Sequence, residues 1–190
     1  MTVATTFPAL GCAVDTVDGR VRAVVAAHHD ALWRFLRRMG VADGQVEDAV
    51  QQVLVVFARR AEDVEAGAER PFLFSTALRV ASDVRRKASR SREIADEEAA
   101  LRHADPGPDA ERQLGDKELR RWLDRLLDEL APELRAVFVL TELEEMTMAE
   151  IGRLLSIPAG TVASRLRRAR EVVEVKAEQL RTLLEEECEP

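Results

Sequence analysis

The chain of 190 residues is 46% hydrophobic and 33% charged, with nine glycines, seven prolines and no tyrosine, a composition that favours helices over an all-β fold. No apolar run is long enough to cross a membrane, the N-terminus lacks the regions of a signal peptide, and the two cysteines and three histidines match no metal-binding spacing. We therefore expect a reduced, cytoplasmic protein without a metal or a cofactor, whose formal net charge of −7 argues superficially against nucleic acid.

The first half of the chain predicts a small bundle of three helices. Residues 1–19 show no convincing periodicity and are expected to form a flexible N-terminal tail. Within residues 20–92, apolar side chains recur at helical spacing until Gly40, a good helix stop, and again after Asp43, which can cap a second helix. After a loop, a third helix is expected to start at Pro71 and to end in a cluster of basic residues.

The second half predicts another helical domain after an acidic linker. Residues 93–116 are acidic and contain a Pro-Gly-Pro break, which indicates the linker. Residues 117–175 open with a leucine-rich helix, followed by a helix that begins at Pro132. Residues 147–150 fit a capping box that starts a short helix, and a tight break follows at residues 156–158.

The helix after this break has a basic face. Residues 160–170 read GTVASRLRRAR, and the helix is expected to continue to about Leu184, with residues 176–190 as an acidic C-terminal tail. At about 100° per residue, the apolar stripe consists of Val162, Leu166, Ala169 and Val173. The opposite face offers hydroxyl and guanidinium groups, which hydrogen-bond base edges and phosphates. A short capped helix, a tight turn and such a helix form a helix-turn-helix; a merely solvated basic face is the alternative interpretation.

Charge is segregated along the chain. Basic side chains outnumber acidic ones in residues 20–92 and 151–170, whereas residues 93–150 and 171–190 are acidic. Two positive blocks separated and ended by negative ones indicate two surfaces that face nucleic acid, and the acidic blocks would discourage loose binding to arbitrary DNA.

Three segments resemble regions of bacterial sigma factors of the sigma-70 family. Residues 147–171, TMAEIGRLLSIPAGTVASRLRRARE, resemble region four, whereas residues 47–57, EDAVQQVLVVF, and residues 70–87, RPFLFSTALRVASDVRRK, resemble region two. Their order resembles the extracytoplasmic-function (ECF) class, which keeps only these two regions. The resemblance implies an all-α protein of two small helical domains that binds core RNA polymerase, recognises a two-part promoter and helps to melt it, without an active site of its own.

The resemblance also implies partners. Region two would dock on the beta-prime clamp helices of core RNA polymerase and read the minus-ten element of promoter DNA. Region four would read the minus-thirty-five element and contact the beta flap. Many relatives are held by an anti-sigma factor, which would compete for the same surfaces.

In region four, the resemblance implies contacts with the minus-thirty-five element by Thr161, Ala163, Ser164, Arg165, Arg167 and Arg168. An arginine there can bond two acceptors on guanine. Thr161 is either a phosphate donor or the N-cap of its helix. Ala163 stands where many relatives carry Lys or Arg, which leaves the sequence preference open at that position.

In region two, Asp48, Gln51 and Gln52 match the core-binding pattern of the family, with glutamine in place of an acid, and Arg59 follows on the same helix. Ordinary surface polarity is the alternative. The implied minus-ten contacts are Phe74, Arg79, Asp83, Arg85, Arg86 and Lys87. Arg79 stands where many relatives have Asn, whose amide pattern an arginine cannot mimic. Phe72 is expected in the core, with Phe74 at the border of a base pocket.

Two other functions compete with a promoter-specificity subunit. A stand-alone helix-turn-helix regulator would bind duplex DNA tightly without polymerase, and a helical adaptor would use its basic faces to bind acidic proteins. An enzyme is not expected, because the sequence has no phosphate-binding glycine loop, metal cluster or nucleophile constellation.

Overall fold

The computed structural model describes residues 11–95 and 122–187, and every regular element in these residues is helical. The all-α prediction is therefore confirmed for the described part of the chain. In chain order the elements are α1 (Gly11–Arg38), α2 (Asp43–Arg60), α3 (Glu69–Ala95), a helical segment over 122–129, α5 (Pro132–Phe138), the π-helix η1 (Val139–Leu143), α6 (Met148–Leu155) and α7 (Ala159–Glu187).

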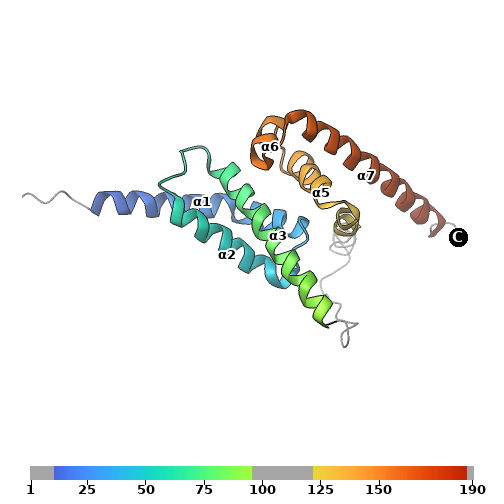
Figure 1. Cartoon of the computed structure of the whole chain (residues 1–190), viewed down its shortest axis with the longest axis horizontal. Helices are drawn as coiled ribbons and strands as arrows, with labels where there is room; N and C mark the ends of the chain where they lie inside the picture. Colours follow the sequence, from blue (N-terminus) through green and yellow to red (C-terminus); the bar gives the residue numbers. More distant parts are fainter. Residues whose placement is uncertain (1–10, 96–121, 188–190) are drawn as a thin grey trace, which may run out of the picture.

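Helices α1, α2 and α3 pack on one another and form the first half of the molecule (Figure 1). Their apolar stripes meet in a core in which the largest side chains, including Leu32, Phe35, Phe57 and Leu73, are completely buried. The rings of Phe35 and Phe74 meet edge to face, with centroids 4.9 Å apart, and lock α1 to α3. The stripes read from the sequence thus form the predicted bundle.

Two predictions in this half differ from the structure. Helix α1 begins at Gly11, so residues 11–19, which show no convincing periodicity in the sequence, are helical. Once packing of the later turns has nucleated a helix, each further residue adds a hydrogen bond without needing an apolar stripe. Asp43 does not cap α2, because Ala42 is the N-cap residue and Asp43 lies in the first turn, where its carboxylate pairs with Arg37 at 3.3 Å.

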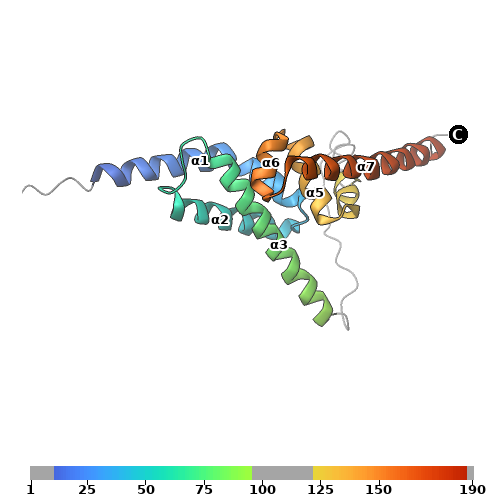
Figure 2. The same cartoon turned by 45° about the horizontal axis from the view of Figure 1, so that its top comes forward.

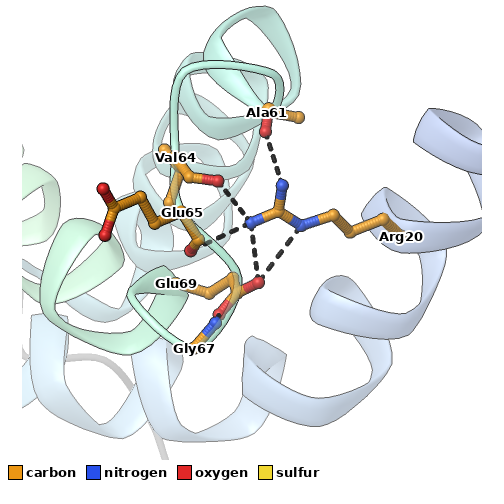
Figure 3. A network of polar contacts seen from close by, with 6 residues as sticks. All are labelled: Arg20, Ala61, Val64, Glu65, Gly67 and Glu69. Atoms are coloured by element: carbon orange, nitrogen blue, oxygen red, sulfur yellow. Dashed lines mark hydrogen bonds and ion pairs between the residues drawn. The ribbon is translucent and has the colours of Figure 1, made fainter.

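One arginine of α1 holds the loop between α2 and α3 (Figure 3). The Arg20 guanidinium donates to the carbonyl oxygens of Ala61, Val64 and Glu65 at 2.8, 2.6 and 3.2 Å. It also pairs with the Glu69 carboxylate at 2.7 Å, and the other oxygen of that carboxylate accepts the Gly67 N–H. These bonds satisfy backbone carbonyl groups of a loop that has no regular hydrogen bonding of its own. They also fix the start of α3 at Glu69.

The second half consists of segment 122–129, α5, η1, α6 and α7 (Figure 2). Pro132 is the first residue of α5, as predicted. The capping box is also confirmed, since the Thr147 hydroxyl accepts the Glu150 N–H and the Glu150 carboxylate accepts the Thr147 N–H. The two bonds satisfy two of the free N–H groups at the start of α6. The Thr147 hydroxyl also donates to the Glu150 carboxylate at 2.7 Å, and this bond, together with the one from the Thr147 N–H, lowers the pKa of Glu150 below its ordinary value.

The break between α6 and α7 is built from one unusual backbone position and one backbone hydrogen bond. Ser156 ends α6 in the left-handed conformation, with φ of 55°, and the N–H of Ile157 donates to the Gly152 carbonyl at 2.9 Å. The tight turn lets α7 begin at Ala159 and pack against both α5 and α6. The predicted helix-turn-helix is therefore present.

The predicted ends of the two domains are not helix ends. Helix α3 runs past residue 92 to Ala95, and the rest of the predicted linker lies outside the described residues. Helix α7 passes without interruption through the predicted boundary at residue 175 and ends at Glu187.

Candidate nucleic-acid interface

Helix α7 divides into the two faces predicted from its sequence. Val162, Leu166 and Ala169 are buried, whereas Ala163, Ser164, Arg167 and Arg168 are exposed on the opposite face. Thr161 and Arg165 are half-buried at the flanks. Because the buried stripe is fixed on α5 and α6, the basic face is held in one orientation toward solvent.

Several of the predicted contact side chains of α7 have partners within the chain. The Ser164 hydroxyl donates to the Thr161 carbonyl at 3.0 Å, and Arg167 pairs with Glu171 at 2.9 Å on the exposed face. Thr161 is not the N-cap, since α7 begins at Ala159 and the Thr161 N–H already donates to Pro158. An exposed pair such as Arg167–Glu171 is weak. The Arg167 guanidinium can therefore leave the Glu171 carboxylate and bind another anion that attracts it more strongly.

A second basic surface follows the outer face of α3. Arg79, Asp83, Arg86 and Lys87 are exposed there, and Asp83 lies 3.9 Å from Arg86. Arg85 is half-buried, and its guanidinium donates to the Met39 carbonyl at 3.4 Å. The structure thus brings five of the six residues predicted for the minus-ten element onto one helix with accessible side chains.

The prediction for Phe74 is wrong. Its ring is completely buried against Phe35, with the Arg70 guanidinium 5.5 Å from the ring centroid, so it does not border a pocket open to a base. Phe72 is the more accessible of the two rings and packs against Phe57 and Arg60 at the surface. The two side chains are about 200° apart on the helix, and α1 covers the side on which Phe74 lies.

A third surface is the exposed stripe of α2. All four residues predicted to bind polymerase, namely Asp48, Gln51, Gln52 and Arg59, are exposed on this helix. Val55 lies within the same stripe and is 47% exposed, although the sequence pattern alone did not select it. Spacing of three to four residues from Gln51 and Arg59 places Val55 on the shared face, and an apolar residue amid polar ones is typical of a protein contact.

Sequence reasoning also missed two buried charges, Arg135 and Glu144. Arg135 is 1% exposed, and its guanidinium donates to the Asp128 carboxylate at 2.6 Å. Glu144 is 7% exposed and lies 3.3 Å from Arg38. Burial raises the pKa of the Glu144 carboxyl, an effect that the nearby arginines oppose, and burial lowers the pKa of the Arg135 guanidinium. Neither burial is visible in the local pattern, because both depend on the other half of the chain.

Known families match both halves. The Sigma-70 region 2 model matches residues 24–91, which hold the bundle of α1, α2 and α3, and the Sigma-70, region 4 model matches residues 120–172, which hold the helix-turn-helix. The chain belongs to the sigma-70 family. From here its halves are called region two and region four.

Relatives of this sigma-70 family chain confirm its resemblance to the ECF class. It is 30% identical over 148 residues to the ECF RNA polymerase sigma factor SigE of Mycolicibacterium smegmatis, across 78% of this chain and 58% of that protein. It is 38% identical over 64 residues to the ECF RNA polymerase sigma-E factor of Escherichia coli, across 34% of each chain. The chain therefore spans less than two thirds of either relative.

Solved structures share the fold. CnrH, in complex with the cytosolic domain of CnrY, matches with a TM-score of 0.65 and 24% identity, over 88% of this chain and 95% of that one. The sigma factor RpoE of Bartonella quintana, in complex with the anti-sigma factor NepR, matches with a TM-score of 0.68 and 20% identity, over 83% of this chain and 96% of that one. At these identities the likeness establishes the arrangement of helices.

Within residues 11–95 and 122–187, no helix has the length and apolar character needed to cross a membrane. The same part of the chain contains no group of histidine, cysteine and carboxylate side chains suited to a metal ion.

Proposed function

We propose that this chain is an ECF sigma factor that binds core RNA polymerase in the cytoplasm and directs promoter-specific transcription initiation. The observation that carries the proposal is the exposed basic face of α7, fixed by its buried stripe within a helix-turn-helix of region four. Ser164, Arg165, Arg167 and Arg168 would contact the minus-thirty-five element, with Ala163 as a small apolar contact and Thr161 as a phosphate donor near the helix start. In the proposed activity, the chain binds core polymerase and brings it to a promoter, and this requires no catalytic group.

Region two would supply the other two contacts. The exposed α2 stripe of Asp48, Gln51, Gln52, Val55 and Arg59 suits a protein partner, and we assign it to the beta-prime clamp helices of polymerase. The outer face of α3 would meet the minus-ten element, with Arg79 stacking on a base or gripping a phosphate and Arg86 and Lys87 on the DNA backbone. Region four would also contact the beta flap.

An anti-sigma factor is a further proposed partner. The two solved structures of similar fold contain CnrY and the anti-sigma factor NepR, respectively. A regulator of that kind would hold this chain away from polymerase by covering the α2 stripe or the basic faces of α3 and α7.

Transcription in vitro tests the proposal. Core polymerase mixed with this chain should start transcription at a discrete set of promoters from a genomic library, and core alone should not. Absence of any promoter-dependent start would sink the proposal. Tight binding of the free chain to duplex DNA without a stable polymerase complex would instead favour the stand-alone regulator.

Matched variants of α2 test the polymerase surface. Asp48→Asn lies on the exposed stripe and should weaken co-purification with core polymerase. Glu47→Gln removes the same charge from the neighbouring position, where the carboxylate faces His29 at 3.4 Å, and should leave co-purification unchanged. Equal effects of the two variants would remove the stripe from the proposed interface.

A further inference from the structure

A cavity of about 420 Å³ is lined by residues from both halves of the chain. Leu78 of α3 lines it from region two, and Ala136 of α5 and Leu155 of α6 line it from region four. The two halves are joined by a buried charge, since the Arg135 guanidinium donates to the carbonyl of Arg38 at the end of α1. A cavity of this volume is in the range that binds small molecules.

The apolar part of this lining is aliphatic. Met39, Ala81 and Pro132 extend the wall that the two leucines and Ala136 begin. No aromatic side chain is among the described residues that line the cavity. Single bases commonly stack on aromatic side chains when proteins bind them, so the lining favours an alkyl chain over a nucleotide.

Three guanidinium groups stand beside the aliphatic wall, Arg85 and Arg86 from α3 and Arg165 from α7. Two of them make long contacts, because Arg85 donates to the Met39 carbonyl at 3.4 Å and Arg86 lies 3.9 Å from Asp83. Arg165 is half-buried, and within residues 11–95 and 122–187 its side chain forms no hydrogen bond or ion pair. A half-buried guanidinium without a partner, beside an apolar wall, is suited to the charged end of an amphipathic anion.

The charge of the cavity favours an anion over a cation. Glu133 is the only carboxylate among the described lining residues, and it is exposed, so the three arginines outnumber it. We propose that this cavity binds an aliphatic carboxylic acid of medium chain length, with its alkyl chain on Leu78, Ala136 and Leu155 and its carboxylate on Arg165. Arginine and carboxylate form short, charge-assisted hydrogen bonds that are frequently bidentate. The inference goes beyond the proposed function, and its test requires neither DNA nor polymerase.

Isothermal titration calorimetry of the full chain tests the site, with sodium decanoate kept below the concentration at which it forms micelles. Decanoate should bind saturably, with one molecule for each chain. From hexanoate to decanoate the affinity should rise severalfold with each added CH₂ group, toward the limit of about fourfold for a fully buried group. An affinity that does not change with chain length would contradict burial of the alkyl chain and overturn the proposal.

Two other probes separate the proposed ligand class from its alternatives. Decyltrimethylammonium carries the same alkyl chain with the opposite charge, and it should bind at least about tenfold more weakly than decanoate because the arginines repel it. Equal binding of the two amphiphiles, or uptake without saturation, would show nonspecific adsorption. Displacement of decanoate by ATP at an equal concentration would assign the cavity to a nucleotide. Each of these results overturns the proposal.

Variants of the full chain locate the ligand. Arg165→Gln should weaken decanoate binding about tenfold or more. Arg168→Gln removes the same charge from the exposed face of the same helix, outside the cavity, and should leave binding unchanged. Equal losses for the two variants, or no loss for Arg165→Gln, would contradict the assigned carboxylate contact.

A blocking variant tests the apolar part of the site. Ser82 lines the cavity but is exposed, so Ser82→Phe should fill the space without disturbing the core. It should abolish decanoate binding while the circular dichroism and thermal unfolding of the chain stay as in the parent. Binding by Ser82→Phe with the affinity of the parent would place the ligand elsewhere on the chain and overturn the proposal.

Discussion

A Cβ atom on Gly152 would lie 2.9 Å from the carbonyl oxygen of Ile157. The Ile157 N–H also donates to the Gly152 carbonyl at 2.9 Å, so the two backbones are in direct contact across the turn of the helix-turn-helix. The contact sets how closely α7 follows α6. A larger residue at position 152 must push the turn away, because the clashing atom belongs to backbone and cannot rotate aside.

Gly152→Ala is therefore expected to lower the free energy of unfolding. Overpacking costs about 1–3 kcal/mol, and the gain of about 1 kcal/mol that alanine brings to a helix interior offsets part of it, which leaves a net loss of up to about 2 kcal/mol. Gly160→Ala is the matched control in the same motif, because its added Cβ meets nothing within 4 Å, and its stability should be unchanged or higher. Urea unfolding compares the three chains, and equal midpoints for Gly152→Ala and the parent would contradict the steric argument.

Arg20→Met is expected to destabilise region two by about 2–3 kcal/mol, because it leaves carbonyl groups of the α2–α3 loop without their donor. Arg20→Lys should recover only part of this, since one ammonium group cannot reproduce the planar fork that reaches Ala61, Val64 and Glu69 together. Arg22→Met, on the same helix with a side chain that is 83% exposed, should change stability by less than about 0.5 kcal/mol. Thermal unfolding and limited proteolysis of the loop report the difference. Similar behaviour of the Arg20 and Arg22 variants would reduce the network to an incidental surface contact.

Glu144 is expected to make stability depend on pH in an unusual direction. Its pKa is raised in the folded chain above the ordinary 4.5, chiefly by burial, so the folded chain binds this proton more tightly than the unfolded chain does. The stabilisation by protonation is complete below the unfolded pKa and is lost as the pH rises through the folded pKa. Relative to Glu144→Gln, the parent should therefore gain stability on acidification from neutral pH toward 4.5.

The measurement is urea unfolding of both chains across that pH range. Taking the difference between them cancels the titration of the remaining carboxylates, which both chains share. A difference that stays constant, or that moves against the parent on acidification, would show that the arginines around Glu144 outweigh its burial.

Arg168→Ala is expected to weaken holoenzyme binding to cognate promoters by about 1–3 kcal/mol if it meets a base, or to lower the salt dependence of binding if it meets a phosphate. Arg170→Ala removes the same charge from the same helix, but Arg170 is engaged by Glu142 through two bonds of 2.9 and 2.6 Å. It should therefore bind promoters nearly as the parent does. Promoters recovered by mapping transcription start sites provide the DNA, and equal losses for the two variants would indicate a general charge effect.

Much of region four was predictable because its information is local. The capping box joins Thr147 to Glu150, three residues away, and the stripe of Val162, Leu166 and Ala169 repeats with the turn of a helix. Such signals can be found in the sequence without knowing which elements pack against these helices. The same holds for the stop at Gly40 and for the exposed faces of α2 and α3, on which most of the candidate site residues lie.

The sequence by itself thus determined the helices, their order, the helix-turn-helix and the family. Only the tertiary structure decided which of Phe72 and Phe74 is buried, because Phe35 of α1 selects the side that is covered. It alone buried Arg135 and Glu144, whose partner Arg38 lies about a hundred residues away in the chain. A charged residue in a helix reads as exposed until a distant partner offers a hydrogen bond in place of water, and such partners are brought together by packing rather than by sequence spacing.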